Sequence, residues 1–135
     1  LDHLSILLSG LDGVQDERRC IDKTMTNLRS LVQRTGISLF LVSHLRRSGN
    51  GSTSAEEGGR VSLSALRGSH SISQISDNVW GLEANQQKEG DRSTVLRVLK
   101  NRYTGDVGIA SSLTYNKDTC VFEEETESFN PTTDF

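Results

Sequence analysis

Cysteine is scarce in this sequence and long apolar runs are missing from it, and each absence excludes a class of protein. The two cysteines, Cys20 and Cys120, lie far apart and in no CxxC or His-rich spacing. We therefore expect neither a disulfide framework nor a zinc site, and a reducing compartment is the default. No stretch approaches the roughly 18 consecutive apolar residues of a membrane helix. The first residues also lack the basic region of a signal peptide.

Motifs of hydrolases and metal sites are absent as well. Ser43, His44 and Asp77 form a catalytic triad only on paper, because the chain has no GxSxG nucleophile elbow. The three histidines and the pair Glu56 and Glu57 have no metal-ligand spacing. Hydrolysis by a serine triad and a clustered metal site are therefore not expected.

Charge is distributed unevenly along the 135 residues, of which 33% are hydrophobic, enough for one modest core. From Asp118 onward there are six acidic residues and no Lys or Arg. All 15 basic residues lie in the first 117, together with the other 12 acidic ones. A mildly basic body with an acidic tail is compatible with nucleic-acid binding.

The first 42 residues have the pattern of a strand, a helix and a second strand. Residues 4–8 are a short apolar run that ends at Ser9 and Gly10, which is typical of a buried parallel strand. A helix is predicted over residues 16–35, with Gly36 as its C-terminal stop. Residues 37–42 form a second apolar run. This order predicts a βαβ unit with a parallel sheet.

The remaining residues predict a loop, a short helix, a strand, a hairpin and a tail. Residues 46–61 are polar and glycine-rich, and a loop of this length is usually functional or disordered. We expect a short helix over residues 71–77 and a strand over 78–82. Residues 94–99 and 108–115 predict a β-hairpin across a turn at 102–106. Beyond Phe122 the acidic tail is expected to be disordered.

Several polar residues next to the apolar runs are candidates for chemistry, each with a simpler alternative. Asp2, beside the first run, suits a magnesium-positioning carboxylate or a turn cap. His44 follows the second run, where open α/β sheets place ligands, or is an ordinary hydrogen-bonded histidine. Lys100 and Arg102, separated by one residue, lie at the end of the third apolar strand. They could clamp a phosphate or belong to a solvated face.

Segments along nearly the whole chain resemble, in the same order, the phage primase–helicase family typified by the bacteriophage T7 enzyme. The matching segments are LDHLSI (1–6), DER (16–18), VSHL (42–45), EEG (56–58), LRGS (66–69), QISD (74–77), NQQ (85–87), LKNRYTGD (99–106), GIA (108–110), YNK (115–117) and TDF (133–135). No single segment is diagnostic, but this many in one order is difficult to produce by chance.

The resemblance implies a role for each matched residue at a nucleotide site between subunits. Asp2 is similar to the Walker B carboxylate that acts on Mg²⁺ bound with ATP or dTTP, and His44 to the sensor of the γ-phosphate. Arg102 resembles the arginine finger that reaches the neighbouring subunit's nucleotide, and Lys100 would assist there. Tyr115 matches the residue that stacks on the nucleotide base.

The same resemblance implies partners for the chain. Residues 46–59 correspond to the loop that grips single-stranded DNA in the central channel of a homo-hexamer or heptamer. The DNA-contact candidates are Arg46, Arg47, Arg67 and Gln74. The tail would dock a replicative polymerase or another replisome protein in the cytoplasm of an infected host. Its candidate residues are Glu123, Glu124, Glu125, Asp134 and Phe135.

Three departures and one absence qualify the resemblance. Residues 48–55 carry no lysine, Ala84 stands where the family has an arginine on the base, and Ser73 replaces a cation. The Walker A motif GxxxxGK[ST] is nowhere in the chain. We expect it, with the catalytic glutamate, upstream of Leu1, which we interpret as a cut end. A fragment lacking both is expected to be inactive alone.

The fold class that we predict is therefore α/β. Residues 1–117 would be the C-terminal part of a RecA-like core, with a parallel sheet flanked by helices and a C-terminal β-hairpin, and residues 118–135 a disordered acidic tail. The predicted function is that of a 5′-to-3′ replicative DNA helicase. The alternatives are a recombinase or clamp-type ATPase of the same fold, and a non-catalytic module that recruits a partner through the tail.

Overall fold

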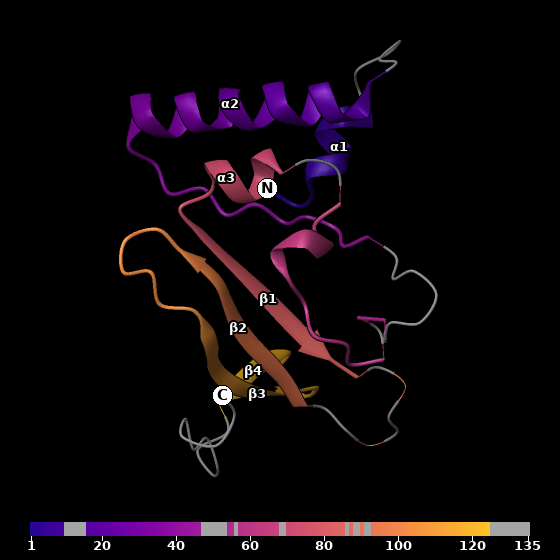
Figure 1. Ribbon diagram of the computed structural model, residues 1–135. Helices are drawn as coiled ribbons and strands as arrows, with labels where there is room; N and C mark the ends of the chain where they lie inside the picture. The colour runs from indigo at the N-terminus through magenta and orange to yellow at the C-terminus, as the bar shows by residue number, and fades with distance from the viewer. Residues whose placement is uncertain are drawn as a thin grey trace. The chain divides into compact units, whose positions relative to one another are not determined.

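The computed structural model describes residues 1–9, 16–46, 54–55, 57–67, 70–85, 87, 90 and 93–124. The chain divides into two compact units (Figure 1). The first comprises Leu1–Arg46 and Ser64–Ser76, and the second Arg47–Leu63 and Asp77–Phe135. None of the helices in these described residues is long and apolar enough to cross a membrane.

The first unit is helical. It contains α1 (Leu4–Ser9), α2 (Glu17–Thr35) and α3 (Ser71–Ile75), and a short 3₁₀ turn (Leu63–Ala65) leads into its second segment. The carboxylate of Asp16 caps α2 by accepting a hydrogen bond from the N–H of Arg19 at 3.2 Å. At the other end Gly36 takes the left-handed conformation (φ 70°) and donates to the carbonyl of Val32. The predicted helices over residues 16–35 and 71–77 are confirmed.

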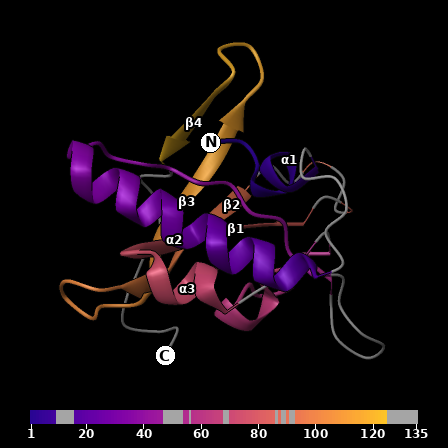
Figure 2. The ribbon, with the colours of Figure 1, turned by 90° about the horizontal axis from the view of Figure 1, so that it is seen from above.

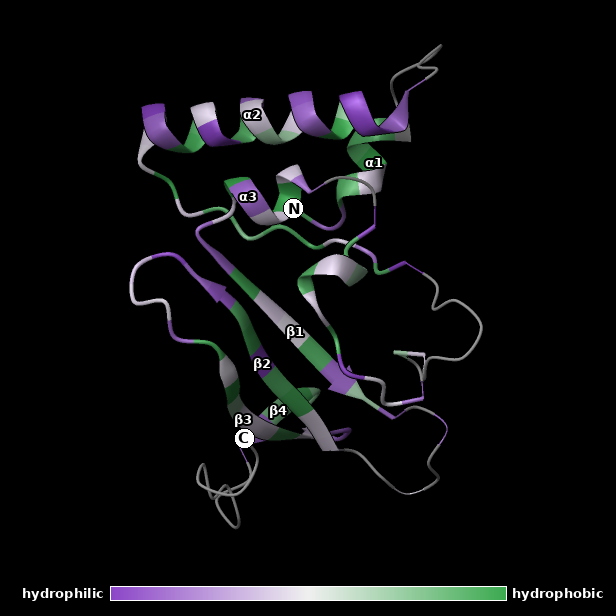
Figure 3. Cartoon of the chain, viewed as in Figure 1, coloured by the Kyte–Doolittle hydropathy of each residue, from purple (hydrophilic) through white to green (hydrophobic). Residues whose placement is uncertain are grey.

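One face of α2 supplies two of the four buried residues in the core of this unit. Ile21 and Met25 recur at helical spacing and are 2% and 4% exposed. They pack with Leu4 and Ile72, which come from α1 and α3. Figure 3 shows the apolar and polar residues alternating along α2, as expected for a helix that buries one stripe.

Residues 4–8 form the helix α1, so the predicted first strand is wrong. Leu4 and Leu8 are four residues apart and pack on the core, whereas Ile6 and Leu7 are 57% and 39% exposed. A buried parallel strand needs neighbours along its edges. A helix satisfies its own backbone, and here it buries only the face that the core can cover.

Residues 37–42 form neither a helix nor a strand, which corrects the second predicted strand. Leu1 donates to the carbonyl of Phe40 and accepts from the N–H of Val42, and Leu4 donates to the carbonyl of Val42. Bonds that advance in the same direction along both segments are those of a parallel pair. The pairing ends there, and the exposure of Phe40 (67%) and Val42 (50%) shows how little covers this segment.

The second unit is built on a four-stranded antiparallel sheet. Its strands are β1 (Asn78–Ala84), β2 (Ser93–Asn101), β3 (Gly108–Asn116) and β4 (Val121–Glu124), in the order β1-β2-β3-β4. The predicted strand over residues 78–82 and the hairpin of 94–99 with 108–115 are confirmed. Figure 2 shows the hairpin formed by β3 and β4 from above.

The α/β class is therefore correct, but the described residues contain no parallel RecA-like sheet. The tail also begins later than expected, because Val121–Glu124 pair with β3. A turn at residues 117–120 reverses the chain between β3 and β4. The hydroxyl of Ser111 donates to the carboxylate of Glu124 at 2.7 Å. Residues 125–135 of the predicted tail lie outside the described residues.

Candidate functional site

Arg102 is held at the start of the turn between β2 and β3. The side-chain oxygen of Asn101 accepts hydrogen bonds from the N–H groups of Tyr103 and Thr104 at 3.0 and 3.2 Å. Gly105, with φ 80°, completes the turn by donating to the carbonyl of Asn101. The N–H of Arg102 donates to the carbonyl of Asp77, and its Nη1 lies 3.0 Å from Oδ1 of the same residue.

Lys100 brings a second cation to this end of β2. Burial lowers the pKa of its ammonium group, and the charge of Arg102 lowers it further, while the carboxylate of Asp77 acts in the opposite direction. Two cations and one carboxylate leave a net positive charge here. The cations Lys100 and Arg102 can therefore bind the anionic oxygens of a phosphate.

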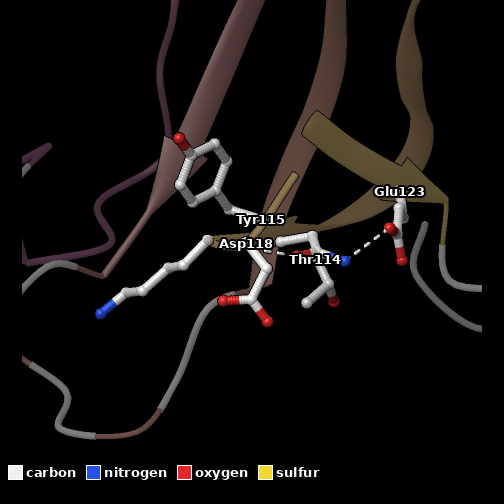
Figure 4. A pocket seen from close by; sticks show the side chains of 6 residues that line it. Thr114, Tyr115, Asp118 and Glu123 are labelled. Atoms are coloured by element: carbon white, nitrogen blue, oxygen red, sulfur yellow. Dashed lines mark hydrogen bonds between the residues drawn. The ribbon is translucent and has the colours of Figure 1, made fainter. Parts of the chain in front are cut away.

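Tyr115 lies on β3 next to an open hollow at the end of the β3–β4 hairpin. Its ring centroid is 5.2 Å from that of Phe122 on β4, with the two planes tilted by 58°. The turn repeats the device of the β2–β3 turn: the side-chain oxygen of Asn116 accepts from the N–H groups of Asp118 and Thr119. Figure 4 shows the side chains of Tyr115, Asp118 and Glu123 projecting from this end, where a flat ring could lie against Tyr115.

Asp2 and His44 both lie in the first unit. The ring of His44, which is exposed, contacts the ring of His3 edge to face, with centroids 4.2 Å apart. Nδ1 of His3 is buried and has no hydrogen-bond partner among the described residues. The parallel hydrogen bonds between residues 1–4 and 40–42 hold the segments that carry Asp2 and His44 side by side.

Asp2 could supply one ligand to a magnesium ion but not a complete site. Its carboxylate is exposed, and the described residues contain no group of three His, Cys, Asp or Glu that could hold a metal. Mg²⁺ in nucleotide sites is usually held by one or two carboxylates together with phosphate oxygens and water. A single carboxylate fits that pattern.

Most of the DNA-contact candidates are exposed residues of the first unit. Arg46 and Arg67 lie on adjoining segments: Arg46 donates its N–H to Ala65, and Arg67 donates its N–H to His44. Nη2 of Arg67 is 3.9 Å from Oε1 of Glu17, and both side chains are more than half exposed. Gln74 is exposed on α3. Arg47 lies outside the described residues.

Two of the tail candidates are part of the sheet. Glu123 accepts a hydrogen bond from the side chain of Asn116 at 2.8 Å, and Glu124 accepts one from Ser111. Both carboxylates therefore stabilise the β3–β4 hairpin. Glu125, Asp134 and Phe135 lie outside the residues that the structure describes.

Sequence reasoning missed a buried ion pair between β1 and β2. Nε and Nη2 of Arg97 donate to the two carboxylate oxygens of Glu83 at 2.8 and 3.0 Å. The side chains are only 13% and 9% exposed. The signal was present: Glu83 is the single charge in β1, Arg97 lies between apolar residues in β2, and opposite charges buried on consecutive strands are expected to pair.

The comparisons with known proteins decide the relationship. No family model matches the chain. It is 42% identical over 119 residues, 88% of its length, to the protein named DNA helicase/primase of Enterobacteria phage T3. The chain is therefore similar to part of a T7-type phage helicase/primase. It spans about one fifth (21%) of the length of that relative.

The relationship confirms the resemblance that the sequence motifs indicated. The candidate residues of this chain are divided between its two units: Asp2, His44, Arg46, Arg67 and Gln74 lie in the first, and Lys100, Arg102 and Tyr115 in the second. Within the second unit, Lys100 and Arg102 share one end of β2, and Tyr115 shares a hollow with the β3–β4 turn.

Proposed function

We propose that the protein in which this sequence occurs is a ring-forming replicative DNA helicase. It would hydrolyse a nucleoside triphosphate at subunit interfaces and move 5′ to 3′ on single-stranded DNA in the cytoplasm of an infected cell. The observation that carries the proposal is the 42% identity, over 88% of the chain, to a DNA helicase/primase.

The geometry of the second unit supports the nucleotide-facing part of this proposal. Arg102 lies in a well-hydrogen-bonded turn next to Lys100 and would reach the phosphates of a nucleotide bound to the neighbouring subunit. A guanidinium there would stabilise the charge on the transferring phosphoryl group. Tyr115 offers an aromatic face to the base, with Phe122 behind it.

The first unit would contribute the remaining roles. Asp2 would provide a carboxylate to the Mg²⁺ that accompanies ATP or dTTP, and this ion neutralises phosphate charge during transfer. His44 would sense the γ-phosphate, and its neighbour Arg46 starts the loop that we assign to DNA. Arg67 and Gln74 would add contacts to the phosphate backbone, which requires positive charge and hydrogen bonds rather than base recognition.

The proposal is tested with the protein expressed from its complete reading frame. We expect hydrolysis that is stimulated by single-stranded DNA, and unwinding of a forked duplex that depends on its 5′ single strand. Unwinding that requires the 3′ strand would overturn the direction. Hydrolysis without any unwinding would favour the recombinase or clamp-type ATPase.

A partner-recruiting module is the alternative from another class. Deleting residues 125–135 tests it and leaves the carboxylates of Glu123 and Glu124 in β4. A helicase keeps DNA-stimulated hydrolysis after this deletion and loses only polymerase recruitment. Loss of polymerase binding in a protein that never hydrolyses a triphosphate would support the module.

A further inference from the structure

The end of the predicted DNA loop (residues 46–59) and the residues directly after it are attached to β1. Val61 donates its N–H to Oε1 of Glu83 at 2.8 Å, and the side chain of Val61 is 4% exposed. Glu57 forms an antiparallel bridge with Asn85. Residues 57–61 therefore run alongside residues 81–85 in the opposite direction.

Two glycines allow this close approach. A Cβ on Gly81 would lie 3.3 Å from Cβ and Cγ1 of Val61, and a Cβ on Gly58 would lie 3.1 Å from Cβ of Asn85. Gly58 also has φ 83°, which side chains rarely adopt. The contact between the loop end and β1 thus depends on backbone fit as well as on the carboxylate.

The carboxylate of Glu83 serves both this loop end and β2. Its oxygens receive the two N–H groups of Arg97 in addition to the N–H of Val61. Arg97 lies opposite Gly81 in the β1–β2 register, so its pairing with Glu83 is diagonal across one face. A bidentate guanidinium–carboxylate pair fixes the orientation of both groups.

Burial raises the pKa of Glu83, but the hydrogen bonds from Arg97 and Val61 and the charges of Arg97 and Arg60 outweigh it and hold that pKa below its ordinary value. The hydrogen bond to Glu83 raises the pKa of Arg97. Both groups are therefore charged at neutral pH, and removing one leaves the other buried without its partner.

We infer that Glu83 and Arg97 are positioning residues that hold the end of the DNA loop on β1 and β2 and thereby couple DNA binding to hydrolysis. Lys100 follows Arg97 on β2 by three residues, which is about 10 Å along a strand. β1 begins directly after Asp77, the partner of Arg102. The same two strands thus carry the loop contact and the cations that we assign to the nucleotide. This inference rests on the proposed function.

The first measurement tests the attachment itself and needs no activity. Amide hydrogen exchange of residues 57–61 is compared in the complete protein and in its Glu83→Ala and Arg97→Met variants. We expect protected amides in the parent protein, with protection lost in Glu83→Ala and reduced in Arg97→Met. Equal protection in all three would overturn the attachment. Arg34→Met, an exposed arginine on α2, is the matched control and should change nothing.

The second measurement tests the coupling. Hydrolysis is measured with and without oligo-dT in the parent, Glu83→Gln, Arg97→Met and Arg34→Met proteins. We expect the stimulation of hydrolysis by DNA to fall at least about fivefold in Glu83→Gln and Arg97→Met. A factor of about five is the lower end of the usual range for coupling between two sites. Hydrolysis without DNA and the unfolding temperature are measured in the same proteins, so that a loss of coupling can be distinguished from a loss of stability. A lower unfolding temperature with unchanged stimulation would mean that the pair only stabilises the sheet.

The two measurements also separate this inference from the proposed function. If the parent protein shows no DNA-stimulated hydrolysis, the proposed function fails and the coupling fails with it, while exchange still decides the attachment. If stimulation is normal in the parent and in both variants, the proposed function stands and the coupling is wrong.

Discussion

Arg102 interacts with Asp77 through a main-chain hydrogen bond and through a side-chain ion pair. The N–H of Arg102 donates to the carbonyl of Asp77 at 2.8 Å, and the guanidinium lies 3.0 Å from the carboxylate. The main-chain bond fixes where the turn begins, whatever the side chains do. The ion pair, with Arg102 40% and Asp77 27% exposed, determines only where the guanidinium points.

Asp77→Asn should therefore release the guanidinium without moving the turn. An ion pair as exposed as this one contributes up to about 1 kcal/mol. We expect DNA-independent hydrolysis in the intact protein to rise by up to about fivefold, and the difference to shrink at high salt because screening already weakens the pair. Lower hydrolysis in Asp77→Asn would show instead that Asp77 orients the finger.

Arg102→Ala and Arg102→Lys test the finger directly. If the guanidinium stabilises the transferring phosphoryl group, Arg102→Ala should lower DNA-stimulated hydrolysis by roughly 10³–10⁵, as in other triphosphatases. Arg102→Lys keeps the charge but loses the planar fork, so it should recover little of the rate. Nucleotide binding, measured with a fluorescent analogue, should stay unchanged, as should both properties in the exposed control Arg19→Ala. Unchanged turnover in Arg102→Ala would remove this residue from the finger role.

The sequence predicted local elements well where their own residues determine them. Helix α2 has a capping Asp16, apolar residues at helical spacing and a terminal Gly36, and all three act in the structure as their chemistry suggests. The hairpin of β2 and β3 follows equally from its turn. Residues 4–8 and 37–42 were misassigned because a short apolar run does not distinguish a helix from a strand. Whether such a run folds as a helix or as a strand depends on which other residues pack against it.

The candidate site was predictable only as single residues. The motifs identified Lys100, Arg102 and Tyr115, but their partners come from other strands. Arg102 contacts Asp77, Arg97 contacts Glu83 and Tyr115 contacts Phe122. These contacts depend on the register of the strands, which is shifted by bulges between Val79 and Trp80 and between Leu96 and Arg97. A bulge shifts every later pairing by one residue. The sequence could indicate that opposite charges on consecutive strands pair, but the register that decides which residues meet had to come from the structure.

Glu83 should make the second unit sensitive to acid. The pKa of its carboxyl is lower when folded than its ordinary value of 4.5, so the unfolded chain binds the proton more readily. The stabilisation is complete above that ordinary value and is lost as pH falls through the lowered pKa. Glu83→Gln should be less stable at pH 7 and should show a flatter loss of stability as the pH falls below 4.5.

Acid unfolding, followed by circular dichroism at a series of pH values, checks this dependence. Glu17→Gln is the matched control, because the side chain of Glu17 is 59% exposed. The control should keep the acid slope of the parent protein. An identical slope in Glu83→Gln would mean that other carboxylates dominate the acid transition.

The core of the first unit should depend on Ile21 far more than on Leu31, although both are large aliphatic residues of α2. Ile21 is 2% exposed and Leu31 36%. Truncating a buried aliphatic side chain costs about 2–5 kcal/mol because it leaves a cavity. We expect Ile21→Ala to lower the opening free energy of the α2 amides by about that much in hydrogen exchange, and Leu31→Ala to lower it by less than 1 kcal/mol. Similar effects of the two would contradict the packing of this face.

Tyr115 and Phe122 should contribute unequally to nucleotide binding. If the base stacks on Tyr115, Tyr115→Ala should weaken nucleotide affinity about tenfold or more, since stacking on one aromatic ring is worth roughly 1–3 kcal/mol. Tyr115→Phe keeps the ring and should bind nearly as well as the parent protein.

Phe122 packs against Tyr115, with ring centroids 5.2 Å apart, and would act only by orienting the ring of Tyr115. Aromatic pairs of this kind are worth about 0.5–1.5 kcal/mol, so Phe122→Ala should weaken binding about two- to tenfold. Titration of a fluorescent nucleotide into the intact protein measures all three, and affinity that survives Tyr115→Ala would place the base elsewhere.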